Sequence, residues 1–165
     1  MLSFTGTERF VSTSASDTPN VSSVGNKSVS LTGTDNAGNS KTVSCPYLVK
    51  YRFGGFLSPI PRSSYTAGAT IPVKFTLAND AGTRISNAAA RALVASTPCK
   101  VKVLFSGGTP TKTCATYNAT TDTFQFDLKT SKSLAAGQYT ISVEVSAPDS
   151  SGVVNTEPVQ VTIRR

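Results

Sequence analysis

Three cysteines are the residues of this 165-residue chain whose spacing points most directly to a covalent bond. Cys99 and Cys114 are fifteen residues apart and flank two extended segments joined by a Gly-Gly-Thr-Pro turn at 107–110. We therefore predict a disulfide across a hairpin or to a neighbouring strand, which would stabilise the fold by about 3 kcal/mol by restricting the unfolded chain. Cys45 is left over, either as a buried free thiol or with a partner outside this sequence.

A second group of chemically capable side chains lies in one short turn. Asp35, Asn36 and Asn39 offer the oxygen ligands that Ca²⁺ prefers, and calcium between tandem modules would stiffen them. The same Asp-Asn-Ala-Gly-Asn sequence is also an ordinary hairpin turn, because Asn and Gly tolerate a positive φ. One carboxylate falls short of a calcium-binding loop, so no cofactor is expected, and calcium is kept as the alternative.

Lys74 raises the question of an intramolecular isopeptide bond. Such a bond needs a buried lysine, an Asn or Asp acceptor and a second carboxyl group, and Asn155 and Asp127 are residues of these types on later predicted strands. The alternation of the segment argues against this hypothesis, because a core-facing Val73 and Phe75 would turn Lys74 toward solvent. Both alternatives remain open from the sequence.

The composition argues against an enzyme. Histidine is absent, which removes His-based triads, His-ligated zinc sites and imidazole acid–base chemistry. Of the nine acidic residues, Asp122, Asp127 and Glu144 lie near one another in the sequence, but in turns and on polar strand faces. Tryptophan is absent too, so no indole platform for a sugar accompanies them. No C-x-x-C motif supports a redox or metal site.

Charge and hydropathy argue against two classes of partner, nucleic acids and the membrane interior. The net charge of +7 arises within residues 49–165, which hold 13 basic and 6 acidic residues, but the cations are scattered singly rather than in runs. This pattern argues against nucleic-acid binding. No apolar run approaches the roughly 18 residues of a membrane-spanning helix, so no membrane insertion is expected. Residues 1–20 lack the apolar region of a signal peptide, so we expect any export signal to lie upstream.

The elements that must position these residues are strands. Between residues 49 and 165, apolar residues alternate in five segments, and an opening strand near 51–57 raises the total to six or seven strands. That number in about 115 residues predicts an all-β, immunoglobulin-like β-sandwich. Residues 87–95 form the one helix-compatible stretch, of a turn or two. The alternating residues are Ile71, Val73, Phe75 and Leu77; Val101, Val103 and Phe105; Phe124, Phe126 and Leu128; Tyr139, Ile141, Val143 and Val145; and Val159, Val161 and Ile163.

Residues 1–48 predict a different, incomplete unit. Val29 and Leu31 alternate into the turn at 35–39, and Val43, Cys45 and Tyr47 return, which indicates a hairpin. Two to four strands cannot close a sandwich and would leave open sheet edges. We therefore interpret this segment as the C-terminal part of a preceding Ig-like module.

Two stretches resemble known bacterial modules. Residues 27–39 (KSVSLTGTDNAGN) are similar to the closing hairpin of bacterial Ig-like repeats, and residues 51–60 and 65–77, with the motif Pro72-Val-Lys-Phe75, resemble the PxKF module of secreted bacterial proteins. Residues 117–130 and 137–141 also fit that module. The resemblance implies an extracellular Ig-like sandwich at the C-terminal end of a large secreted or surface protein. It supplies no catalytic residues, and the chain departs from it at Gly137-Gln-Tyr139, where a cysteine is often present.

These observations predict a non-catalytic, extracellular spacer module whose partners are neighbouring domains of a secreted or cell-surface bacterial protein. Two alternatives belong to other classes. In the first, the chain is a carbohydrate-binding, cell-wall-binding or adhesion module whose basic residues meet wall polyanions. In the second, it is a surface-filament subunit in which residues 1–48 pair with an exposed strand of a like subunit.

Overall fold

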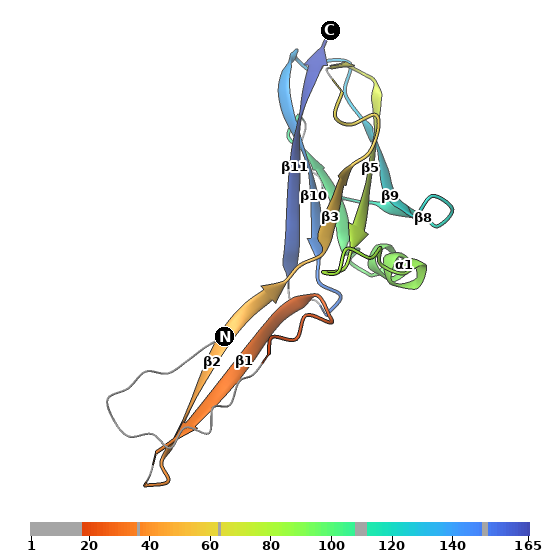
Figure 1. The fold of residues 1–165 in the computed structure, drawn as a ribbon. Coiled ribbons are helices and arrows are strands. Elements are labelled where there is room, and N and C mark those ends of the chain that lie inside the picture. Colours follow the sequence, from red (N-terminus) through yellow and green to blue (C-terminus); the bar gives the residue numbers. More distant parts are fainter. Residues whose placement is uncertain (1–17, 36, 63, 108–111, 150–151) are drawn as a thin grey trace. The chain divides into compact units, whose positions relative to one another are not determined.

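The computed structural model describes residues 18–35, 37–62, 64–107, 112–149 and 152–165. The chain divides into two compact units, Met1–Val49 and Lys50–Arg165. Both units are built from β-strands (Figure 1), so the predicted all-β class is confirmed.

The first unit contains an antiparallel hairpin of β1 (Gly25–Thr34) and β2 (Ser40–Val49), as predicted. Its two faces differ in chemistry because the side chains alternate. Val29 and Leu31 share one face and are only 7% and 8% exposed. The opposite face carries pairs of hydroxyl groups. The hydroxyl oxygens of Thr32 and Thr42, for example, lie 2.7 Å apart. The hairpin is therefore apolar on one face and Ser/Thr-rich on the other.

The second unit is an immunoglobulin-like sandwich of two sheets (Figure 1). The order β3-β5-β9-β8 corresponds to strands A-B-E-D of the immunoglobulin fold, and β11-β10-β6 corresponds to G-F-C. Two short strands extend the second sheet, with β4 running parallel to β11 and β7 antiparallel to β6. The strands are β3 (Arg52–Phe56), β4 (Tyr65–Thr66), β5 (Thr70–Ala78), β6 (Val101–Phe105), β7 (Thr113–Cys114), β8 (Thr116–Asn118), β9 (Thr123–Lys129), β10 (Gly137–Ser146) and β11 (Val153–Arg164).

The core of the sandwich lies between the inward faces of these sheets. Ile71, Val73 and Phe75 of β5 are fully buried, as the alternation predicts. Phe75 stacks on Phe124 of β9 with ring centroids 5.4 Å apart, and Phe53 of β3 lies 5.6 Å from Phe75. Stacked aromatic pairs of this kind add about 0.5–1.5 kcal/mol beyond the area that they bury.

Pro72 is tolerated inside β5 because of where β3 ends. The N–H of Leu57 donates to the carbonyl oxygen of Lys74 at 2.8 Å, so the backbone groups of Lys74 point toward the β3 side. Backbone groups alternate in direction along a strand, so those of Pro72, two residues earlier, also point toward the β3 side. Since β3 ends at Phe56, the N–H that proline lacks is not needed by the ladder.

The helix-compatible stretch forms α1 (Asn87–Ala95), which lies at one end of the sandwich (Figure 1). The side chain of Ser86 caps it by accepting from the N–H of Ala89 at 3.2 Å. Ala90 and Leu93, three residues apart, are its buried residues, and they anchor the helix to the core. None of the described helices has the length and apolar character needed to cross a membrane.

Tyr139, near the start of β10, forms a corner that is typical of immunoglobulin-like domains. Its hydroxyl donates to the carbonyl oxygen of Ala135, four residues upstream, at 2.9 Å. This is the position and the contact of the tyrosine corner at the beginning of strand F. The bond fixes the chain where it enters the central strand of its sheet.

Candidate functional site

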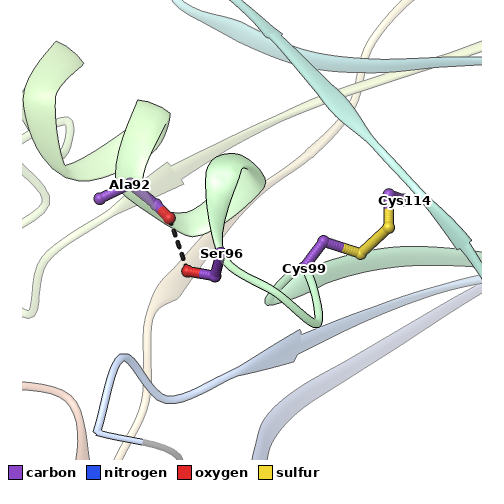
Figure 2. Close-up of a disulfide and its surroundings, with 4 residues drawn as sticks. All are labelled: Ala92, Ser96, Cys99 and Cys114. Carbon is purple, nitrogen blue, oxygen red and sulfur yellow. Dashed lines mark hydrogen bonds between the residues drawn. A yellow bond between two sulfur atoms is a disulfide. The ribbon is translucent and has the colours of Figure 1, made fainter.

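The predicted disulfide between Cys99 and Cys114 is present, with the two Cα atoms 5.9 Å apart (Figure 2). Cys99 is buried and lies between α1 and β6, whereas Cys114 belongs to the edge strand β7. On the α1 side, the hydroxyl of Ser96 donates to the carbonyl oxygen of Ala92 at 2.7 Å and ends the helix. The bridge therefore ties the chain that leaves α1 to the edge of the five-stranded sheet.

Cys45 is a free thiol on β2. It is half-buried and lies opposite Val29, on the apolar face of the hairpin. Within the described residues Cys45 forms no disulfide, and a partner outside this sequence stays a prediction.

The turn carboxylate of Asp35 binds its own turn. Its Oδ1 accepts from the backbone N–H groups of Ala37 at 2.9 Å and Asn39 at 2.8 Å. Its Oδ2 accepts from the side-chain amide of Asn39 at 2.9 Å. The bond from the Asn39 side chain, followed by the backbone bonds, lowers the pKa of Asp35 below its ordinary value. The carboxylate thus acts as the internal cap of a hairpin turn.

The calcium hypothesis gains no ligand cluster from this geometry. Asn39 presents its amide as a donor to Asp35, and the predicted ligand Asn36 lies outside the described residues. Within the described ranges, no three His, Cys, Asp or Glu side chains gather in a way that could hold a metal ion.

The predicted isopeptide site of Lys74, Asn155 and Asp127 does not assemble, and this prediction is corrected. Lys74 lies opposite Gln125, and Asp127 lies opposite Pro72, on the outer face of the four-stranded sheet. Asn155 is only 4% exposed and belongs to β11 in the other sheet. The alternation that buries Val73 and Phe75 turns the lysine outward and separates it from the core.

Asn155 instead closes the sandwich at its first residues. Its Oδ1 accepts from the N–H of Tyr51 at 3.0 Å, and its Nδ2 donates to the carbonyl oxygen of Tyr51 at 3.0 Å. The same Nδ2 donates to Oε1 of Glu157 at 3.0 Å. Burial, and then the charge of Asp149, raises the pKa of Tyr51. A buried amide thus replaces a ladder partner for a chain segment 104 residues away.

A polar cluster that the sequence did not suggest holds α1 against the turn between β8 and β9. The hydroxyl of Tyr117 lies 2.6 Å from Oδ1 of Asp122 and 2.5 Å from Oδ1 of Asn87 on the helix. Arg84 donates to the carbonyl oxygen of Asp122 at 3.1 Å. Burial, and then the bond to Asp122, raises the pKa of Tyr117. These contacts join a helix, a strand and a turn, so the cluster stabilises the fold.

A groove of about 360 Å³ lies beside β6 and β9, which belong to opposite sheets of the sandwich. Val103 and Phe105 line it from β6, and Phe126 and Leu128 line it from β9. Asp127 and Lys129 also line it and are exposed on β9. The groove is lined by residues of two different sheets, so the alternation within single strands did not predict it.

No model of a known protein family matches the chain, and a search of curated proteins finds no match either. The resemblance to bacterial Ig-like repeats and to the PxKF module therefore remains a prediction.

Proposed function

We propose that this chain is a non-catalytic structural module of a secreted or cell-surface protein, in which it spaces neighbouring domains. One observation carries the proposal: three side chains that the sequence marked as capable of chemistry are engaged in contacts that hold the fold. Asp35 binds its own turn, Asn155 binds Tyr51, and Cys99 is bonded to Cys114. Each contact stabilises an element or joins two of them, as a structural module requires.

The disulfide supports the extracellular part of the proposal. Disulfides form and persist in oxidising compartments, and they are rare where glutathione and thioredoxin keep thiols reduced. The bridge between Cys99 and Cys114 links the segment after α1 to an edge strand, where fraying would otherwise begin. The resemblance to secreted bacterial modules supports the same location.

The first test is the covalent state of the exported protein. We expect a chain secreted behind an added signal peptide to show, by intact mass spectrometry without reductant, one disulfide and one thiol that reacts with iodoacetamide. The control is the Cys99→Ser/Cys114→Ser variant, which should show only the Cys45 thiol. Three reactive thiols in the secreted wild-type chain would overturn the extracellular assignment.

The second test separates a spacer from a wall-binding module. Purified chain is mixed with isolated bacterial cell walls and sedimented at low and at physiological salt. A spacer stays in the supernatant in both conditions, whereas a module that binds wall polyanions sediments at low salt and is released by added salt. Sedimentation at low salt, whether or not added salt releases the chain, would replace the spacer proposal with a binding function.

A further inference from the structure

Along part of its length, strand β9 is bordered on one side only, as far as the described residues show. Strand β5 borders it from Phe124 to Lys129, but β8 borders its other side only from Thr123 to Gln125. Among the described residues, no strand pairs with Phe126–Lys129 on the β8 side. This four-residue edge runs beside the groove lined by Phe126 and Leu128.

The hydrogen-bonding groups that this edge presents follow from the alternation of the sheet. Thr130 donates its N–H to Ala69 on the β5 side at 3.0 Å, so Leu128 and Phe126 also direct their backbone groups to β5. The intervening residues point the other way, and the carbonyl oxygen of Gln125 accordingly accepts from Thr116 of β8 at 3.1 Å. Asp127 and Lys129 therefore direct their N–H and C=O groups to the open side.

We propose that two copies of this chain associate through this edge, with β9 antiparallel to β9 about a two-fold axis at Leu128. In that register Asp127 lies opposite the second copy's Lys129, and Lys129 lies opposite the second copy's Asp127. The backbone N–H and C=O groups of both residues point to the open side of β9. Each Asp127–Lys129 pair therefore exchanges two backbone hydrogen bonds. The contact is isologous, as in most soluble dimers.

Charge complementarity selects a second copy as the partner. Asp127 and Lys129 are two residues apart, so their side chains lie on the same exposed face of the sheet. Charged residues on an edge strand usually keep other strands away. An antiparallel copy in this register instead places each charge opposite its counter-charge, which stabilises a cross-strand pair.

The space around the axis also suits this partner. Leu128 is 9% exposed and occupies the position without backbone hydrogen bonds, where the Cα atoms of facing residues are about 4.5 Å apart. The groove beside it is lined by the half-buried rings of Phe105 and Phe126, which offer apolar surface to the second leucine. Because β9 ends at Lys129, the second copy's strand ends before it reaches β8. This pairing goes beyond the proposed spacer role and does not depend on it.

Sedimentation equilibrium of the full chain tests the proposal, with the Cys45→Ser substitution in every sample to prevent disulfide dimers. We expect a concentration-dependent dimer. Asp127→Lys and Lys129→Asp each place like charges opposite one another and should weaken the dimer by about tenfold or more. An equimolar mixture of the two variants restores opposite charges and should form a heterodimer. Lys74→Asp, on the outer face of the neighbouring strand β5, is the control and should dimerise as the parent does.

A monomeric parent at all concentrations, or a mixture that stays monomeric, would overturn the proposal. So would variants that dimerise as tightly as the parent.

Crosslinking gives an independent measurement of the register. In the Cys45→Ser background, Leu128→Cys should form a disulfide-linked dimer under mild oxidation, because the expected Cα separation lies within the range of disulfides. Thr76→Cys, a buried position on β5 away from the axis, should not, and equal crosslinking of both would also overturn the register.

Discussion

Asn155 illustrates how a single buried amide can join distant parts of the chain. It satisfies both backbone groups of Tyr51, so we expect Asn155→Ala to lower the free energy of unfolding by about 2–4 kcal/mol, because a buried donor and acceptor lose their partners. Urea denaturation followed by far-ultraviolet circular dichroism measures this loss. The neighbouring exposed Thr156 provides the control, since Thr156→Ala should change stability by less than about 0.5 kcal/mol. Equal effects of the two substitutions would mean that the amide does not close the sandwich.

The Asp35 turn gives a prediction about pH. The bonds from Asn39 and the turn amides lower the pKa of Asp35 in the folded hairpin below its value of 3.8 in the unfolded chain. The folded state therefore binds fewer protons, and the stabilisation is present above pH 3.8 and lost as pH falls through the lowered value. Carboxyl NMR shifts should show a midpoint below 3.8, and Asn39→Ala should raise it. A midpoint that Asn39→Ala leaves unchanged would contradict the assigned cause.

Residue types and their spacing predicted some of the sites but not others. The disulfide was predictable because only three cysteines exist and two of them flank a hairpin-like segment. The isopeptide hypothesis was wrong because residue types do not reveal which sheet a strand joins, and Asn155 lies in the sheet opposite Lys74. Nothing local in the sequence marks the bond between Asn155 and Tyr51, because the two residues are 104 positions apart.

At the scale of elements, the disulfide fixes an edge. We expect the Cys99→Ser/Cys114→Ser variant to lose about 3 kcal/mol of stability, the entropy of closing a 15-residue loop in the unfolded chain. Hydrogen exchange should show the loss of protection first in β7 and in the chain between α1 and β6. Cys45→Ser is the matched control and should leave the unfolding of the sandwich unchanged. A double variant as stable as the parent would show that the bridge constrains little of the unfolded ensemble.

Long strands were predictable and short ones were not. Apolar and polar residues alternate in the long strands because one face of each strand is buried, and this alternation is visible in the sequence. These strands are β5, β6, β9, β10 and β11. β4, β7 and β8 have two or three residues each, too few for a period to show. They exist because a neighbouring strand offers hydrogen bonds. β8 borders β9 only from Thr123 to Gln125, and the sequence alone did not reveal that the rest of this edge has no partner among the described residues.

At the scale of the whole molecule, the two units differ in how much structure each holds. The described part of residues 50–165 contains two sheets, the disulfide and the stacked Phe75 and Phe124, all internal to that unit. The hairpin unit has two paired strands within its described residues, and a lone two-stranded hairpin is marginally stable in water. Stability should therefore be distributed unequally along the chain.

We expect a fragment of residues 50–165 to unfold cooperatively, with a free energy within about 0.5 kcal/mol of the sandwich transition in the full chain. Urea denaturation of both proteins gives this comparison, and a fragment of residues 1–49 is the counterpart, which should show no cooperative transition. In the full chain, amides of β1 and β2 should exchange before those of β5, β9 and β10, because local opening follows local stability. If residues 50–165 alone are unfolded, or lose several kcal/mol, the hairpin unit contributes to the stability of the sandwich and the two units fold as one.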